Sequence, residues 1–249
     1  MTNSLQGQTA LVTGSTSGIG RAIALRLAGL GAHVIVSGRD DARGGDVVER
    51  IRAEGGSADF VHADLSTGAG AARLADAAAA VTGQIDILVN NAGVFPFAST
   101  ADTTEDIVDQ VLAVNIKAPL LLTSALIPTM AARGTGSVVN VGSVAGSMAL
   151  TGATAYSASK AAIHQLTRVW VAEYATSGVR FNTVAPGYTE TEGSQANTDE
   201  ALRAALVSLT PAGRGGRPDE IADAVAFLVG DDARYIHGAL LTVDGGSGV

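Results

Sequence analysis

Seven short runs of β-branched and aliphatic residues recur along the chain, separated by longer stretches with helical spacing. Ile23, Leu27 and Leu30 illustrate that spacing. Strands that alternate with helices of this length form βαβ units and a parallel sheet. The runs are apolar almost throughout, as expected when helices cover both faces of a sheet. The sequence therefore predicts an α/β fold with one doubly wound, seven-stranded parallel sheet, its strands at 9–13, 33–37, 58–63, 85–90, 137–141, 179–185 and 239–243.

The chain has no composition break that would mark a linker, so we expect a single domain over residues 1–249. Residues 186–217 interrupt the alternation, because they are polar and glycine-rich around one amphipathic helix predicted near 199–209. A long irregular insertion in a compact domain is usually functional or mobile. We interpret residues 188–215 as a substrate segment that carries the specificity. A surface loop without function is the alternative.

Composition excludes several classes of function. The net charge of −8 and the pI near 4.9 disfavour a surface for nucleic acid or anionic membranes. Without cysteine, the chain cannot form disulfides, thiolate nucleophiles or cysteine-ligated zinc sites. His33, His62, His164 and His237 lack metal-ligand spacing, so we expect structural histidines and no metal. We see neither a signal-peptide pattern nor an apolar run long enough to span a bilayer, and expect a soluble cytoplasmic protein.

The first strand enters a glycine-rich turn, TGSTSGIG (13–20), with Gly14, Gly18 and Gly20 before a helix. A dinucleotide pyrophosphate binds N–H groups at a helix N-terminus and needs backbone free of Cβ atoms. The spacing G-x3-G-x-G differs from the common G-x-G-x-x-G pattern. A tight turn without a ligand is the alternative, but the position at the first strand–helix junction favours a dinucleotide cofactor.

The end of the second strand bears on which dinucleotide binds. NAD-binding chains usually carry an acid there that accepts bonds from the ribose 2′-hydroxyl, but this chain has Arg39. A guanidinium can pair with a 2′-phosphate and stack on adenine, so NADP(H) is favoured over NAD(H). Asp40 and Asp41 follow and would repel that phosphate if they pointed inward. A solvated loop charge is the alternative role of Arg39.

Tyr156 and Lys160 stand four positions apart in TAYSASKAAI (154–163). The chain has only two lysines against fourteen arginines, and a chance Tyr-x3-Lys has odds of roughly 3%. A free tyrosine pKa of about 10 is high for acid–base work near neutral pH. A nearby ammonium stabilises the phenolate, and a shift of about three pH units corresponds to roughly 4 kcal/mol. We therefore expect Tyr156 to be the acid–base group and Lys160 to lower its pKa.

Two further residues complete a candidate catalytic set. Ser143 follows the strand SVVNV (137–141), at the sheet edge where open α/β sheets bind ligands. Its hydroxyl could donate to a substrate oxygen as negative charge develops there. Asn115 lies in a predicted helix, although an amide is a mediocre helix former. For Asn115 alone, a buried amide that satisfies backbone groups is the alternative.

The joint pattern resembles the short-chain dehydrogenase/reductase family over essentially the whole chain. The motifs TGSTSGIG, NNAG (90–93), YSASK (156–160) and PGYTET (186–191) occur in that family's order, together with the closing stretch 216–246. The resemblance, including similarity to 3-oxoacyl-ACP reductases, implies a Rossmann-like fold and NAD(P)(H)-dependent interconversion of a ketone and a secondary alcohol. It also implies a homotetramer, to which helix 218–229 and the last strand could contribute an interface, or else ordinary core.

The resemblance also implies individual roles. Asn115 would hold a water that links Lys160 to solvent, and Lys160 would bond the nicotinamide ribose, for which the small residues 157–159 would leave room. Asp64 would meet the adenine amino group, and Asn90 and Gly93 would line the adenosine side. In PGYTET the backbone of Thr189 and the hydroxyl of Thr191 would meet the carboxamide. The complete set of expected cofactor-binding residues is Gly14, Ser17, Gly18, Ile19, Gly20, Arg39, Asp64, Leu65, Asn91, Gly93, Tyr156, Lys160, Pro186, Gly187, Thr189 and Thr191.

The substrate itself is not defined by these motifs. Apolar residues flank the expected site and indicate a small-molecule substrate with an apolar portion; they are Val94, Phe95, Phe97, Val144, Met148 and Tyr188. A catalytically silent dinucleotide sensor that binds a partner is the alternative function, although such a protein should have lost at least one of the four catalytic groups. A nucleotide-sugar epimerase would need a larger C-terminal substrate domain.

Overall fold

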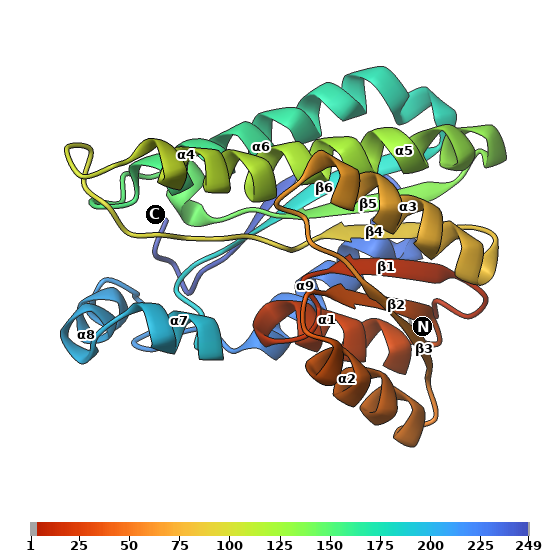
Figure 1. Ribbon diagram of the computed structural model, residues 1–249, viewed down its shortest axis with the longest axis horizontal. Coiled ribbons are helices and arrows are strands. Elements are labelled where there is room, and N and C mark those ends of the chain that lie inside the picture. The colour runs from red at the N-terminus through yellow and green to blue at the C-terminus, as the bar shows by residue number, and fades with distance from the viewer. Residues whose placement is uncertain (1–3, 249) are drawn as a thin grey trace.

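The computed structural model describes residues 4–248, in which seven parallel strands form one sheet (Figure 1). The strand order is β3-β2-β1-β4-β5-β6-β7. The Rossmann-like α/β architecture predicted from the sequence is confirmed, with every strand within about two residues of its expected position. The strands are β1 (Thr9–Thr13), β2 (His33–Gly38), β3 (Ser57–His62), β4 (Ile87–Asn90), β5 (Gly136–Val141), β6 (Val179–Pro186) and β7 (Leu240–Val243).

Helices cover both faces of the sheet (Figure 1). One face packs against α1 (Gly18–Gly29), α2 (Asp41–Ala53) and α9 (Pro218–Val229), and the other against α3 (Gly68–Thr82), α5 (Ala118–Arg133) and α6 (Thr154–Tyr174). Successive strand residues point to opposite faces, so Leu11 joins one apolar cluster and Val12 the other. Burial on both faces explains why the strands read as nearly continuous apolar runs.

The strand order reverses beside β1, which pairs with β2 on one side and with β4 on the other. From the carboxyl end of β1 the chain crosses to β2 on one side, and from the carboxyl end of β4 it crosses to β5 on the other side. Ligands of open α/β sheets bind in the crevice at such a switch point. The residues that follow β1, β2, β4 and β5 therefore meet at one edge of the sheet.

The stretch 105–133 is helical throughout, as α4 (Glu105–Leu112), the π-helical turn η1 (Ala113–Lys117) and α5. By length and composition this stretch could cross a membrane, so the expectation that no apolar run is long enough to do so is wrong. Leu122, Leu126 and Met130 of this stretch are buried in the apolar core. A core helix passes the same test, and its packing against α3 and the sheet favours that interpretation.

The substrate segment differs from the prediction in one respect, because it contains two helices. Beyond the expected helix, observed as α8 (Glu200–Ser208), the structure has α7 (Glu192–Asn197). Thr191 and Ser194 cap α7 reciprocally, each side-chain oxygen accepting from the other's backbone N–H. A helix of six residues has too few turns to show an apolar period. Figure 1 shows α7 and α8 projecting from the body of the fold.

The remaining helical turns are short and follow strands or helices. They are η2 (Val144–Gly146) after β5, η3 (Ala175–Ser177) after α6 and η4 (Asp231–Ala233) after α9. Of these, η2 matters most for the site, since it begins directly after Ser143.

Candidate active site

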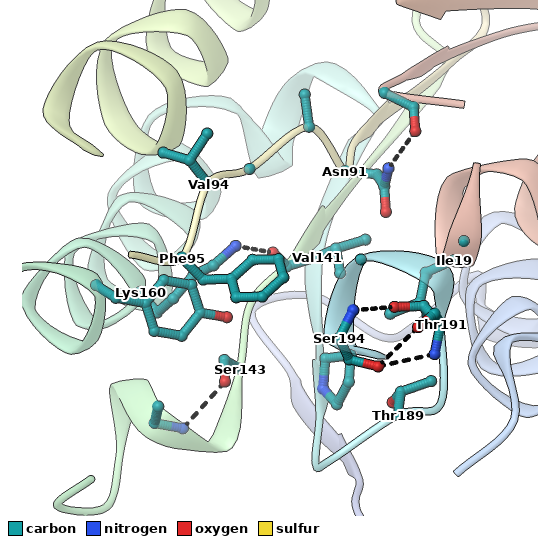
Figure 2. A pocket seen from close by; sticks show the side chains of 18 of the residues that line it. Ile19, Asn91, Val94, Phe95, Val141, Ser143, Lys160, Thr189, Thr191 and Ser194 are labelled. Atoms are coloured by element: carbon teal, nitrogen blue, oxygen red, sulfur yellow. Dashed lines mark hydrogen bonds between the residues drawn. The ribbon is translucent and has the colours of Figure 1, made fainter. Parts of the chain in front are cut away.

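A cavity of about 560 Å³ opens at the carboxyl edge of the sheet. The β1–α1 turn, the residues after β2 to β6, helix α6 and the substrate segment all contribute to its lining. Figure 2 shows Ser143, Phe95 and Lys160 on one side of it, and Ile19, Thr189 and Thr191 on the other. Every residue of the expected catalytic and cofactor-binding sets lines this cavity except Asn115.

The glycine turn has the shape expected of a phosphate cradle. Gly14 has φ +62°, and a Cβ there would lie 2.9 Å from the Cα of Ala92. A Cβ on Gly20 would overlap the carbonyl oxygen of Gly14, so larger residues would open the turn. Ser17 precedes α1 in an extended conformation without a side-chain capping bond. The N-terminus of α1 therefore faces the cavity with close backbone access for an anion.

Arg39 lines the cavity, whereas the two acids that follow it are turned to other partners. Asp40 caps α2 by accepting from the N–H of Arg43 at 3.0 Å and pairs with its guanidinium. Asp41 accepts from His62 at 2.7 Å. Neither aspartate lines the cavity, so the repulsion that the sequence left open does not arise there. Arg39 is exposed at the cavity wall and free to meet an anionic group.

Asp64 stands beside Arg39 on the same part of the wall. Hydrogen bonds from Ser66, and secondarily the charge of Arg39, hold the pKa of Asp64 below its ordinary value. This carboxylate is thus an acceptor only, which suits the amino group expected there from the resemblance.

The two asparagines of NNAG have different positions. Asn91 lines the cavity and donates to the Thr13 carbonyl at 2.8 Å and to that of Gly14, which ties the loop after β4 to the glycine turn. Asn90 is buried and donates to Asn140 at 2.9 Å. The expectation that Asn90 lines the adenosine side is therefore wrong. Strand alternation explains the difference, because neighbouring side chains cannot both face the cavity.

Tyr156 and Lys160 lie on α6 as expected, and Ser143 faces Tyr156 across the cavity. The Lys160 ammonium donates to the carbonyl of Val141 at 2.8 Å and lies 5.7 Å from the centre of the Tyr156 ring. The Ser143 hydroxyl accepts from the N–H of Ala145, which fixes its oxygen and leaves its hydrogen available for donation. Three polar groups thus converge where a substrate carbonyl could sit.

The protonation states differ from the expectation. Burial raises the pKa of Tyr156, and the hydrogen bond from Ser143 offsets this only in part. Burial also lowers the pKa of Lys160 to about 8. The expected lowering of the tyrosine pKa by the ammonium is therefore not seen in the protein alone, because loss of water disfavours the phenolate more than these partners favour it.

Asn115 does not line the cavity; it lies behind it, 1% exposed, in the π-helical turn η1. Its amide donates to the Val94 carbonyl and to Ser159, and its carbonyl oxygen accepts from the Val94 N–H at 2.8 Å. These bonds match the alternative in which the amide satisfies backbone groups. A Cβ on Gly93 would touch both Asn115 and Lys160, so the two side chains lie close together there.

The small residues after Tyr156 serve a different purpose from the one expected. None of residues 157–159 lines the cavity. Ser159 is fully buried, donates to the Tyr156 carbonyl and accepts from Asn115. The expectation that they leave room for a ribose is therefore wrong: Ser159 faces η1 on the inner side of α6, and Ala158 is exposed to solvent.

Residues that follow β6 complete the wall. Thr189 is buried and its hydroxyl donates to the Gly187 carbonyl. The Thr191 oxygen accepts from the N–H of Ser194 at 2.9 Å, which leaves the hydroxyl hydrogen free. Further lining residues were missing from the sequence-based set, among them Thr16, Ser37, Ser66, Val114, Leu150, Leu206 and Leu209. The spacing of Leu202, Leu206 and Leu209 along the predicted helix was a usable signal for the last two.

The histidines hold structural positions. His33 bonds Ser57, and His62 bonds Asp41. His164 is buried beside Gly142, and burial lowers its pKa to about 4. His237 is partly buried, and its pKa is lowered by burial and by the charge of Arg180. Within residues 4–248, no three His, Asp or Glu side chains gather as metal ligands would.

Comparison with known proteins decides the family. A family profile described as "Enoyl-(Acyl carrier protein) reductase" matches residues 14–248. The bovine protein "Dehydrogenase/reductase SDR family member 4" is 40% identical over 98% of this chain and 88% of its own length. The chain belongs to the short-chain dehydrogenase/reductase family.

Two other members show the range of chemistry among similar proteins. The "Cis-4-hydroxycyclohexanecarboxylate dehydrogenase" of Sinomonas cyclohexanicum is 39% identical over 96% of both chains. A solved gluconate 5-dehydrogenase from Burkholderia cenocepacia J2315, in complex with NADP and tartrate, superimposes with a TM-score of 0.93. It is 36% identical, and the match covers 99% of this chain and 97% of that one. The short-chain dehydrogenase/reductase family therefore accounts for the fold and the oxidoreductase class.

Proposed function

We propose that the protein is an NADP(H)-dependent oxidoreductase that interconverts a ketone or 3-oxo group and a secondary alcohol. The observation that carries the proposal is the convergence of Tyr156, Ser143 and Lys160 on a cavity that also contains a glycine cradle. The cavity suits a dinucleotide, because the N-terminus of α1 faces it without a side-chain cap and Arg39 stands at its far wall. Reduced nicotinamide supplies a hydride when bound.

The chain's own residues handle the substrate oxygen and its proton. Ser143 donates a hydrogen bond to that oxygen as charge develops on it. Tyr156 holds a proton firmly, since its pKa is raised, and delivers it to the oxygen during reduction. Lys160 places a positive charge beside the Tyr156 phenol. Its hydrogen bond to the Val141 carbonyl fixes the position of the ammonium. In the oxidative direction the same groups act in reverse.

Replacement of the tyrosine tests this mechanism. Initial rates with NADPH and a ketone panel should fall by about 10²–10⁴-fold in Tyr156→Phe, because the variant lacks the proton donor. Tyr174→Phe is the matched control, since Tyr174 lies on the same helix and packs against Phe181 away from the cavity. Cofactor consumption by Tyr156→Phe at the wild-type rate would show that the mechanism is wrong.

Replacement of the arginine tests the choice of cofactor. Arg39 is free at the wall and Asp40 and Asp41 are turned away, which supports recognition of a 2′-phosphate. In Arg39→Gln the KM for NADPH should rise by about 10-fold or more, while that for NADH stays within about 2-fold. Arg50→Gln is the control, because Arg50 lies on α2, pairs with Glu54 and does not line the cavity. Equal rates of the wild type with NADPH and NADH would count against this role of Arg39.

A catalytically silent dinucleotide sensor is the second candidate. The retention of Tyr156, Ser143 and Lys160 around an open cavity disfavours it. Tight binding of NADPH by calorimetry, without turnover on broad panels of ketones and alcohols, would favour the sensor over the enzyme.

A further inference from the structure

The part of the cavity beside Tyr156 and Ser143 has an apolar lining. We call it the substrate side; its large apolar residues are Val94, Phe95, Phe97, Val114, Val144, Met148, Leu150, Tyr188, Leu206 and Leu209. The rings of Phe95 and Tyr156 meet edge to face with centroids 6.3 Å apart. A substrate carbonyl within reach of the tyrosine must therefore place its neighbouring groups against aromatic and aliphatic surface.

Apart from Lys160, no charged side chain among the described residues lines the substrate side. The whole cavity lining contains three charged residues. Arg39 and Asp64 follow β2 and β3, at the opposite end from the tyrosine. Lys160 is 5% exposed and donates to the Val141 carbonyl. No lining cation is thus placed to receive an anionic group on the substrate.

The rim of the substrate side is apolar as well. Phe97 and Met148 are each 41% exposed and Leu209 is 72% exposed, although all three are large apolar side chains. They come from the loop after β4, the loop after β5 and the end of α8, and they meet at one cavity. Clustered apolar exposure of this kind marks a ligand-binding groove.

The charged side chains of the substrate segment offer the cavity no unpartnered cation. Glu190 and Glu192 are carboxylates, and Glu192 pairs with Arg21 of α1 at 3.3 Å. Arg203 on α8 does not line the cavity, and its guanidinium donates to the carbonyls of Gln195 and Thr198. Arg214 is paired with Glu220 at 2.6 Å.

We infer that the enzyme selects ketones and alcohols whose body is uncharged and apolar, and discriminates against substrates that carry a carboxylate near the reacting carbon. This inference rests on the proposed function and specifies its substrate class. It sets the chain apart from two similar proteins, whose names refer to cyclohexanecarboxylate and gluconate substrates. A carboxylate that loses water without gaining a partner is strongly disfavoured in an apolar site.

A matched pair of ketones tests the inference. 4-Methylcyclohexanone and 4-oxocyclohexanecarboxylate share the ring and the carbonyl and differ in a methyl group against a carboxylate. With NADPH, kcat/KM should be at least about 100-fold higher for the neutral ketone. Equal or reversed preference would overturn the inference while leaving the proposed function intact.

A binding measurement separates failure of the proposed function from failure of the inference about substrate class. If no ketone in the panel is turned over, the proposed function fails, and the inference is then decided by calorimetry on protein saturated with NADP. Cyclohexanecarboxamide should bind more tightly than cyclohexanecarboxylate, which has nearly the same shape. Tighter binding of the carboxylate would overturn the inference.

A pair of variants tests whether the lack of charge at the rim sets the preference for the neutral ketone. Met148→Lys places a cation at the rim and should reduce the preference for the neutral ketone by about 10-fold or more. Val169→Lys is the control, because Val169 is 39% exposed on α6 but does not line the cavity. The control should keep the wild-type preference. An unchanged preference in Met148→Lys would show that the apolar rim does not select the substrate.

Discussion

Lys160 carries its charge inside the protein, with the carbonyl of Val141 to receive it. Burial lowers its pKa to about 8, against 10.5 for the exposed side chain. Burial of an ammonium destabilises the folded state, so this residue contributes to the site at the expense of stability. The same low pKa leaves Lys160 charged only up to slightly alkaline pH in the protein without cofactor.

Lys160→Met should remove this cost in a pH-dependent way. Between pH 8 and 10.5 the folded wild type has released a proton that the unfolded chain still binds, so its stability rises with pH there. The variant lacks this gain, and its free energy of unfolding relative to wild type should therefore fall by about 2 kcal/mol between about pH 7 and pH 9.5. Urea unfolding at both pH values, without cofactor, measures the difference. A difference independent of pH would show that Lys160 has an ordinary pKa.

At the scale of elements, the site depends on where the π-helical turn η1 (Ala113–Lys117) lies. A π turn inserts one residue into a helix and is often found at functional sites. Here it presents Asn115 to the loop after β4, where its amide pairs with both backbone groups of Val94. That loop also carries Gly93 and Phe95 into the cavity. η1 therefore fixes the position of the loop after β4, which forms one cavity wall, relative to α6.

Asn115→Ala distinguishes the two roles considered for this residue. Removal of the amide leaves the Val94 N–H and C=O without their side-chain partner, which should lower stability by about 1–3 kcal/mol. A role in proton supply predicts in addition a loss of kcat in the folded fraction. Urea unfolding and initial rates on the same preparation give both values. Unchanged stability with a lower kcat would exclude the structural role. Lower stability with an unchanged kcat would exclude the water link.

The sequence predicted elements better than side-chain directions. Nearly continuous apolar runs located the strands, because both faces of the sheet are buried, and helical spacing located α9. The same pattern does not say which of Asn90 and Asn91 faces the cavity, because a shift of one residue along the strand turns a side chain to the opposite face. The pattern also does not reveal α7. That helix is defined by the local capping hydrogen bonds of Thr191 and Ser194, and it is too short to show apolar periodicity. The raised pKa of Tyr156 depends on burial, which spacing does not report.

At the scale of the whole molecule, part of the apolar surface expected at an interface is core. Ile221 and Val225 of α9 are fully buried and belong to the cluster beneath α1. Phe227 is 41% exposed on the same helix, and Tyr235 is 96% exposed before β7. β7 is also an edge strand of the sheet. An edge strand flanked by exposed aromatic rings is suited to pairing with another copy.

We propose a homotetramer on these grounds. Sedimentation should give a mass of about 100 kDa for the 24.9 kDa chain. Phe227→Glu should shift the distribution toward smaller species, because it places charge on an apolar contact, whereas Arg50→Glu at an exposed charged position of α2 serves as the control. A wild-type mass near that of one chain would exclude the tetramer.

The reversal of strand order beside β1 divides the cavity along the sequence. Lining residues up to Ser66 come from the β1–β3 side, and the rest come from Asn91 onward. Under the proposed function, the first group binds only the adenine-side part of the nucleotide, and the second binds the nicotinamide part and the carbonyl compound. Exchange of one stretch between relatives would then alter nucleotide preference and leave substrate choice as it was. A fold with this arrangement can diversify its chemistry by inheriting the two halves separately.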